Sequence, residues 1–170
     1  MRLAPLVNLS AALAAAPSGA SGPHHTLRLM RDMIRRARLD PAIIQAAHSI
    51  IYLAPERDEY AEVCALYEWV RDHVRYVRDV AGVETLAYPV KTLQRLSGDC
   101  DDQTALLCSL AESVGYPTRL VMAAYQSTDW EHVYCQIFAR GEWINCDPID
   151  REYSLGSEPP NPLRVFIESI

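Results

Sequence analysis

The sequence lacks the features that would mark it as a metal-binding, disulfide-rich or membrane protein. Its five cysteines are odd in number, form no CxxC pair and have no histidine at the spacing of a zinc site. We therefore expect no metal and no disulfide framework, and a reducing compartment is the default. No run of apolar residues is long enough to cross a bilayer, so no membrane span is expected. No cofactor-binding motif occurs, and we expect no cofactor.

Positive charge is also scarce. The 170 residues include 16 Lys and Arg against 22 Asp and Glu, a formal net charge of -6. Proteins that bind nucleic acid by neutralising phosphates need the opposite balance, so nucleic-acid binding is not expected. Five arginines cluster between residues 28 and 38 beside an apolar stripe at helical spacing. We interpret them as the solvated face of an amphipathic helix.

What is present is the composition of an ordinary globular protein, with 49% hydrophobic and 22% charged residues. We divide the chain into a flexible or partner-bound arm (1–25), a helical extension (26–57) and one main domain (58–170). The arm loosely imitates a signal peptide, but Pro5 and Asn8 interrupt its apolar stretch. We therefore prefer an arm to a cleaved signal.

The spacing of apolar residues predicts helices in the first part of the chain. They are expected at residues 26–39, 42–53, 58–77 and 100–114, with a linker at 17–25 and a short segment at 89–96. Asp40 and Pro41 provide the cap and the first-turn proline of the second helix. Gly115 closes the last helix with a left-handed cap.

From Thr118 the apolar period changes to that of strands. Strands are expected at residues 118–125, 131–139, 142–146 and 163–170, the last at a sheet edge. Arg140 and Gly141 form the tight turn between the second and third strands. The expected fold class is α+β, with N-terminal helices followed by a helix packed on an antiparallel sheet.

Cys100 lies where the turn at residues 97–99 becomes a helix. The first turn of a helix offers free backbone N–H groups and a positive dipole end, which stabilise a thiolate and can bind an oxyanion. Asp99, Asp101 and Asp102 act in the opposite direction, because carboxylates disfavour a nearby thiolate. A catalytic Cys100 therefore needs an opposing cation. The alternative interpretation is that these acids simply stabilise the start of the helix.

His132 and Asp147 have the positions of a base and an orienting acid for Cys100. In a hairpin that turns at residues 140–141, the two lie near each other across the pair. Asp147 can then accept the histidine N–H and fix its tautomer. Asp150 is the alternative acid, but Pro148 directs it away from the strand.

Secondary candidates surround these three residues. Gln94 is a candidate second oxyanion donor, and Trp130 and Tyr88 are expected to border the cleft. Asp99 and Asp101 are cleft candidates that cap the turn or position a neighbouring loop. The remaining cysteines occupy core or strand positions without a base of their own: Cys64, Cys108, Cys135 and Cys146.

Four segments together resemble the transglutaminase-like superfamily of papain-type cysteine enzymes. They are Gly-Asp-Cys-Asp-Asp at 98–102, Gly-Tyr-Pro-Thr-Arg at 115–119, Glu-His-Val-Tyr at 131–134 and Trp-Ile-Asn-Cys-Asp-Pro at 143–148. The resemblance implies that Cys100 is the nucleophile, His132 the base and Asp147 the acid, and that 58–170 is the catalytic domain. The chain departs from animal transglutaminases in lacking their large flanking domains and an evident calcium loop.

The motif at 98–102, with the segments at 75–79 and 89–93, is also similar to small transglutaminase-like proteins of tailed phages and prophages. This resemblance implies a place in the host cytoplasm or the virion, with secretion as the alternative, and phage tail or virion partners bound through the arm. The expected function is a cysteine-dependent amide or peptide hydrolase or acyltransferase. Its substrate would be a peptide or protein, such as a cell-wall peptide. The alternative is a non-enzymatic structural or adaptor protein of a phage tail.

Overall fold

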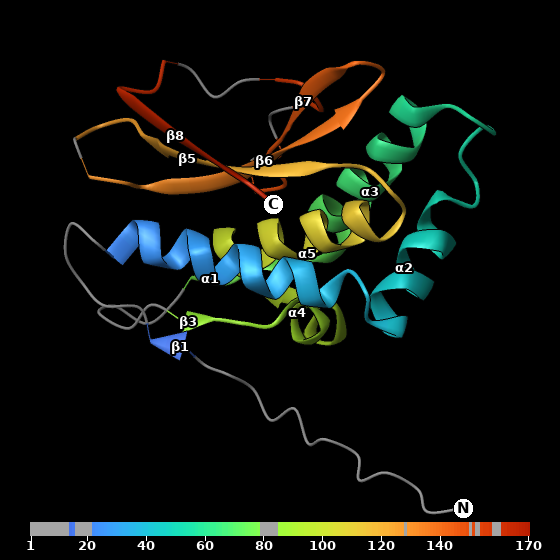
Figure 1. The fold of residues 1–170 in the computed structure, drawn as a ribbon, viewed down its shortest axis with the longest axis horizontal. Coiled ribbons are helices and arrows are strands. Elements are labelled where there is room, and N and C mark those ends of the chain that lie inside the picture. The colour runs from blue at the N-terminus through green and yellow to red at the C-terminus, as the bar shows by residue number, and fades with distance from the viewer. Residues whose placement is uncertain are drawn as a thin grey trace, which may run out of the picture.

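The computed structural model describes residues 14–15, 22–78, 85–127, 129–149, 151, 154–157 and 161–170. The molecule has two layers, with helices on one side and an antiparallel sheet on the other (Figure 1). The α+β class expected from the sequence is confirmed, and the four strands of the main sheet follow the helices in the chain.

Five helices make up the helical layer: α1 (Gly22–Ala37), α2 (Pro41–Ile51), α3 (Glu59–His73), α4 (Pro89–Arg95) and α5 (Cys100–Ser113). Helix α1 begins within the predicted linker, because a proline is tolerated in a first helical turn. Asp40 caps α2 as expected, accepting the backbone N–H of Ala42 at 2.9 Å. Among the described helices, none is long and apolar enough to cross a membrane.

Helix α3 ends at His73, earlier than the predicted end at residue 77. The chain then forms β2 (Arg75–Tyr76), which pairs in parallel with β4 (Ser97–Gly98). The N–H of Arg75 donates to Leu96 O at 2.9 Å, and that of Val77 donates to Gly98 O at 3.0 Å. These donors are therefore not available to continue the helix. The pairing attaches the end of α3 to the turn that precedes α5.

A second small pair joins the arm to the main body of the protein. Strand β1 (Ala14–Ala15) is antiparallel to β3 (Thr85–Leu86), with Ala14 opposite Leu86. The remaining described part of the predicted arm, residues 22–25, belongs to α1.

The main sheet contains β5 (Thr118–Ala124), β6 (His132–Ala139), β7 (Glu142–Cys146) and β8 (Arg164–Ser169). All neighbours are antiparallel in the order β7-β6-β5-β8, so β8 is an edge strand as expected. Arg140 and Gly141 have φ values of 53° and 82°, the left-handed conformations that a two-residue hairpin turn requires.

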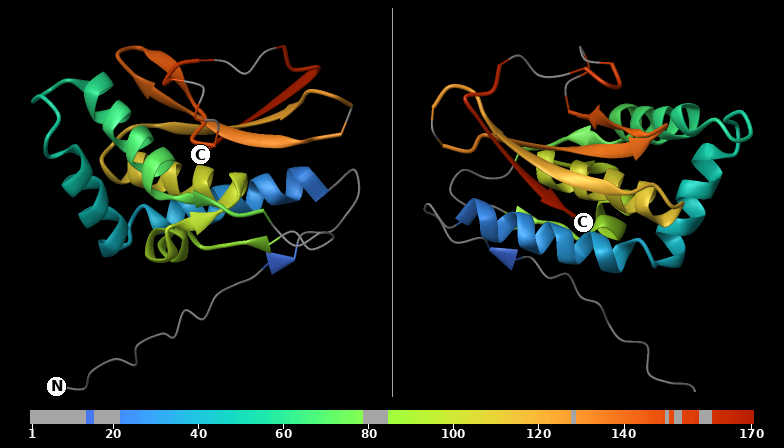
Figure 2. Two further views of the ribbon diagram at one scale, coloured as in Figure 1. Left: turned by 180° about the vertical axis from the view of Figure 1, so that it is seen from behind. Right: turned by 45° about the horizontal axis from the view of Figure 1, so that its top comes forward.

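Helix α5 lies between the sheet and the other helices (Figure 2). Its Leu106 and Leu110 share one hydrophobic core with Ile137 of the sheet and with Met30 and Ile43 of the first two helices. The segments predicted as a helical extension (26–57) and as the catalytic domain (58–170) thus pack around the same core.

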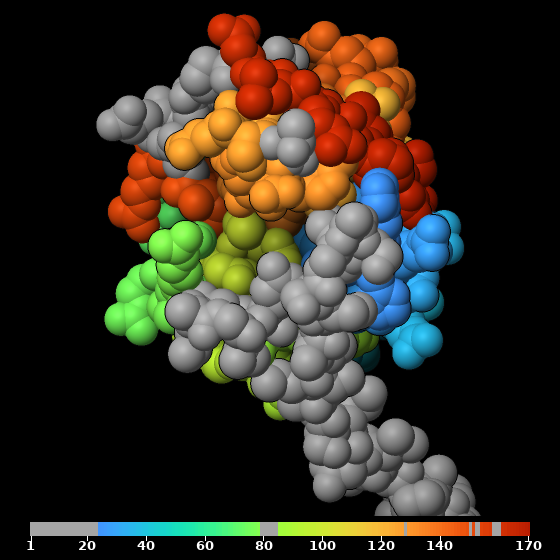
Figure 3. Space-filling view, turned by 90° about the vertical axis from the view of Figure 1, so that its left-hand side faces the viewer, coloured from blue at the N-terminus to red at the C-terminus, as the bar shows by residue number. Residues whose placement is uncertain are grey.

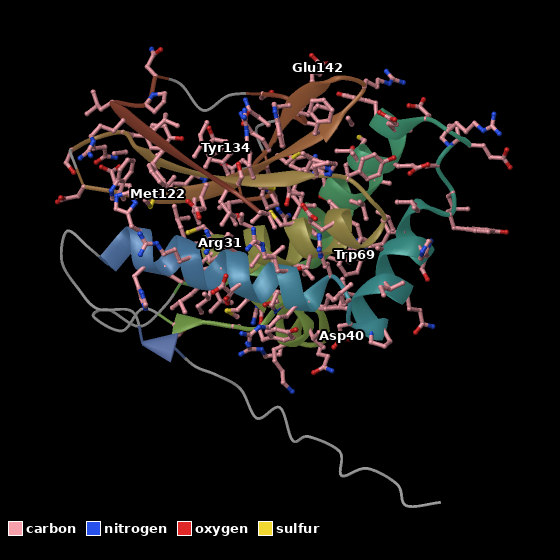
Figure 4. All side chains as sticks on the ribbon, viewed as in Figure 1. Arg31, Asp40, Trp69, Met122, Tyr134 and Glu142 are labelled. Atoms are coloured by element: carbon pink, nitrogen blue, oxygen red, sulfur yellow. The ribbon has the colours of Figure 1, made fainter. Side chains whose placement is uncertain are left out.

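The arginines of α1 have two different surroundings. Arg28, Arg35 and Arg36 are exposed, which agrees with a solvated face. Arg31 pairs with Glu168 of β8, and Arg38 pairs with Glu112 of α5 at 2.9 Å. Figure 4 labels Arg31 on α1 below the sheet and Tyr134 at the sheet. These two arginines therefore join α1 to the rest of the domain.

Candidate active site

The turn before Cys100 is held from several sides. Gly98 O accepts the Gln103 side chain at 3.1 Å as well as the Val77 N–H. A Cβ atom at Gly98 would lie 2.5 Å from Cβ of Asp102, too close for a side chain. Asp102 in turn accepts the Ala87 N–H at 2.7 Å. The glycine and the last aspartate of the motif at 98–102, Gly98 and Asp102, are therefore explained by backbone placement.

Burial and the carboxylates beside Cys100 both raise the pKa of its thiol. Asp99 caps α5 by accepting the Asp102 N–H at 3.3 Å, and Asp101 Oδ1 accepts the Cys100 thiol at 3.4 Å. The pKa of Cys100 is raised, first by burial and then by the negative charges of Asp101 and Asp99. The acids thus disfavour the thiolate, as the sequence predicts.

Two contacts place the start of α5 against β6 beside His132. The backbone N–H of Val133 faces the Cys100 sulfur and lowers its pKa, against the larger effects of burial and charge. One helical turn further, Thr104 Oγ1 donates to Val133 O at 3.2 Å. Cys100 is therefore a neighbour of the His132–Val133 peptide.

His132 and Asp147 form a close polar pair. His132 Nε2 lies 2.6 Å from Asp147 Oδ2, and the Ile149 N–H donates to Asp147 Oδ1 at 3.2 Å. Because Cys135 lies opposite Cys146, residue 147 would face residue 134, and His132 is its diagonal neighbour. The expected juxtaposition is therefore present, although the catalytic roles of the two residues remain predictions. Asp150, the alternative acid, lies outside the described residues.

The pairing with Asp147 engages Nε2 of His132. Among the bonds of the described residues, the Cys100 sulfur is joined to Asp101 and not to His132. Catalytic hydrogen bonds often tighten only when substrate binds. Figure 3 shows the olive atoms of the α4–α5 region set back between the orange atoms of the sheet side and the green atoms to their left.

Tyr76 is a neighbour of Cys100 that the sequence does not reveal. It lies opposite Gly98 in the β2–β4 pair and is 48% exposed. The pKa of its phenol is raised by burial and then by the charges of Cys100, Asp99 and Asp101. The sequence places Tyr76 within a predicted helix, and only the β-branched residues on either side, Val74 and Val77, indicate a strand there.

The secondary candidates have contacts elsewhere. Gln94 is exposed on α4, and its amide oxygen lies 3.5 Å from Lys91 Nζ. Trp130 lies under the Arg164 guanidinium, 4.7 Å from it, and 6.3 Å from the His24 ring. Tyr88 precedes α4. The pKa of its phenol is raised by burial and then by the charge of Asp40, against a smaller lowering by Arg36. Their roles at the site remain predictions.

The described residues include no group of three or more His, Cys, Asp or Glu side chains that could hold a metal ion.

Comparison with known proteins identifies the family and the fold of this chain. A family model, that of the transglutaminase-like superfamily, matches residues 47–148, more than half of the chain. No curated protein matches the chain.

Three solved structures share the fold. A candidate protease from Parabacteroides distasonis has a TM-score of 0.61 at 10% identity, with 94% of this chain and 34% of that chain covered. A candidate cysteine protease from Cytophaga hutchinsonii has a TM-score of 0.53 at 17% identity, with 75% of this chain and 47% of that chain covered. Rad4–Rad23 crosslinked to undamaged DNA has a TM-score of 0.50 at 11% identity, with 82% of this chain and 42% of that chain covered. The chain thus spans less than half of each of these proteins, and identities this low show the fold alone. On the match of the family model, the chain belongs to the transglutaminase-like superfamily, whose fold is that of cysteine hydrolases and acyltransferases.

Proposed function

We propose that the protein is a cysteine-dependent amide hydrolase or acyltransferase that acts on a peptide or protein. The observation that carries this proposal is the 2.6 Å pair of His132 and the buried Asp147, located beside a half-buried cysteine at the start of a helix. A nucleophile, a base and an orienting acid are the parts of a thiol-dependent acyl transfer.

In the first half of the reaction, the Cys100 thiol gives its proton to Nδ1 of His132, and the sulfur attacks the substrate carbonyl carbon. The backbone N–H groups at the start of α5, the Val133 N–H and the Tyr76 hydroxyl are the nearby donors for the resulting oxyanion. His132 then protonates the departing amine nitrogen as the carbon–nitrogen bond breaks. The product of this half is a thioester on Cys100.

In the second half, water or another amine attacks the thioester carbonyl. His132 accepts the proton of the attacking group and returns it to the sulfur as the carbon–sulfur bond breaks. Water gives hydrolysis and an amine gives acyl transfer. Asp147 stabilises the imidazolium in both halves.

The test is Cys100→Ala, with Cys108→Ala as the matched control because Cys108 is fully buried on the same helix. Turnover of a chromogenic amide or a peptidoglycan peptide should fall at least about 1,000-fold in Cys100→Ala and change little in the control. An electrophilic probe should also label Cys100 before the other cysteines. Unchanged turnover in Cys100→Ala would contradict the proposed mechanism.

A second candidate function is a non-enzymatic one, as a structural or adaptor piece of a phage tail. The observation that favours it is the Cys100 thiol, which is bonded to Asp101 and has a raised pKa. Tail or virion proteins would bind through residues 1–25. An adaptor would keep partner binding in Cys100→Ala, lose it when these residues are deleted, and show no turnover of any amide.

A further inference from the structure

The two edge strands of the main sheet, β7 and β8, have different surroundings (Figure 1). Along β7, the backbone N–H of Gly156 donates to Asn145 O at 2.9 Å, so the segment at 154–157 lies against that edge. Within the described part of the chain, no backbone bond reaches residues 165–169 from outside their ladder with β5. We therefore call the outer side of β8 the open edge.

The backbone groups of β8 alternate between β5 and the open edge. The Ile170 N–H donates to Thr118 O at 3.3 Å, in register with the β5–β8 ladder. Hydrogen-bonded and non-bonded pairs alternate along an antiparallel ladder, so the even-numbered residues of β8 bond to β5. The N–H and C=O groups of Val165, Ile167 and Ser169 therefore point outward, where another strand can bond to them.

The side chains of β8 leave this edge unprotected. Val165 and Ile167 lie on one face of the strand and are 46% and 43% exposed. The strand has six residues and contains neither proline nor lysine, which commonly block edge strands. An exposed apolar edge of this length is a template for pairing with a further strand.

The sequence of β8 is complementary to itself in the antiparallel direction. A two-fold axis at Phe166 places Arg164 of each copy opposite Glu168 of the other. The same axis places Val165 opposite Ile167, so that the outward backbone groups of the two copies meet. Opposite charges and apolar pairs directly across a ladder are stabilising. Parallel pairing in register would instead bring like charges together.

The two charged side chains of β8 also have contacts within their own chain. Arg31 binds Oε1 of Glu168, and the Arg164 guanidinium lies 4.7 Å from the centre of the Trp130 ring. A carboxylate has two acceptor oxygens and a guanidinium has five N–H donors. These contacts are therefore compatible with a further ion pair between copies.

We propose that β8 is a dimerisation strand, on which a second copy of this chain adds its own β8 and continues the sheet. The occupant is a second copy because the charges and the apolar side chains of β8 match those of β8 itself. A single strand pair is a small interface, so dimerisation depends on concentration. The inference goes beyond the proposed function, because it uses none of Cys100, His132 and Asp147.

Sedimentation velocity of the full chain over a concentration series tests the proposal. We expect a reversible dimer that predominates at about 100 µM. Ile167→Pro removes an outward N–H and spares the bonds to β5, so dimerisation should weaken at least about tenfold. Ile167→Lys should weaken it similarly through a charge on the edge, and this variant provides the test if circular dichroism shows that the proline disturbs the fold. Leu53→Lys, at an exposed apolar residue outside the sheet, is the control and should dimerise as the wild type does.

The register is tested by Phe166→Cys, because residue 166 lies opposite itself across the two-fold axis. The Cα atoms of such a non-hydrogen-bonded pair are about 4.5 Å apart, within the range of a disulfide. Diamide, which takes up the two thiol hydrogens, should therefore convert this variant to a covalent dimer on a denaturing gel. Leu53→Cys and the wild type are the controls and should remain monomeric there.

Three outcomes would overturn the proposal. A monomer at every concentration up to about 100 µM would leave the open edge to an extended segment of a different protein. A dimer that neither Ile167 variant weakens would use another surface, and failure of Phe166→Cys to cross-link would exclude the two-fold axis at residue 166. Cys100→Ala should dimerise like the wild type, so this proposal and the proposed function can fail separately.

Discussion

Helix α5 carries two cysteines whose surroundings differ at every point that matters for chemistry. Cys100, at its start, is half-buried, with two carboxylates and the Val133 N–H beside it. Cys108, two turns along, is fully buried and has Cys135 of the sheet as its neighbour. Both thiols have a raised pKa, and in both cases burial is the largest cause. The pKa of the isolated thiol therefore does not distinguish the reactive cysteine from the structural one.

What distinguishes the two cysteines is whether a thiolate could be compensated once it forms. At Cys100 the Val133 N–H is close to the sulfur, and the imidazole of the preceding residue, His132, is paired with Asp147. At Cys108 the polar neighbours are the buried Cys135 thiol, which raises the pKa of Cys108, and the Thr118 side chain, whose smaller effect lowers it. Reactivity is thus a property of the helix start and its strand neighbours, and the three predictions below test this comparison.

The largest effect is expected from Gly98→Ala, which would make the start of α5 resemble an ordinary turn. The added Cβ would lie 2.5 Å from Cβ of Asp102, whose carboxylate holds the Ala87 N–H. We expect a loss of about 1–3 kcal/mol in the free energy of unfolding, measured with urea, together with loss of selective Cys100 labelling. Ser97→Ala, in the same strand, is the control and should change neither. Wild-type stability in Gly98→Ala would show that the turn is not sterically fixed.

A smaller effect is expected from Asp101→Asn, which removes a charge that raises the pKa of Cys100. A lower pKa of the Cys100 thiol gives more thiolate at a given pH, so alkylation of Cys100 by iodoacetamide at pH 7.5 should become faster. Each unit of pKa corresponds to about tenfold in thiolate. Glu142→Gln, an exposed carboxylate on β7, should leave the rate unchanged. A slower reaction in Asp101→Asn would mean that Asp101 helps the thiolate and would reverse our account of the acidic turn.

The smallest effect is expected from Cys108→Ala, on the stability of the protein at alkaline pH. In the unfolded chain the Cys108 thiol ionises near its ordinary pKa of 9.0, whereas in the folded protein its pKa lies well above that value. The folded state then binds more protons above pH 9, so its stability falls as the pH rises. At pH 9.5 the contribution of one such thiol is about 0.8 kcal/mol. Between neutral pH and pH 9.5, the free energy of unfolding measured with urea should therefore fall by about 0.8 kcal/mol less in Cys108→Ala than in the wild type. An equal fall in both proteins would contradict this prediction.

Much of the fold could be predicted because the local signals and the tertiary packing agree. Asp40 and Pro41 start α2, and Arg140 and Gly141 make the hairpin turn, since these residue types suit those backbone conformations. The predicted end of α3 is wrong because the backbone N–H groups beyond His73 bond to the segment at 96–98 instead of continuing the helix. No local pattern reveals that pairing. The predicted start of α1, residue 26, is wrong because a proline occurs equally in linkers and in first helical turns, and the helix begins at Gly22.

The site was predictable where chain order and spacing determine it. His132 and Asp147 flank a tight hairpin, so their proximity follows from strand register. Tyr76 was not predicted as a site residue, because a parallel strand pair brings it to the turn before Cys100. Side-chain contacts between distant elements carry no signature in a single sequence.

The shared hydrophobic core has a consequence for what counts as the unit of this protein. The family pattern covers residues 47–148, yet Met30 and Ile34 of α1 are fully covered within the same core as α5. A shortened chain that begins at residue 47 would leave the covering of α5 incomplete and place apolar side chains in water. The cooperative folding unit is therefore larger than the segment that the family model matches, and it includes α1.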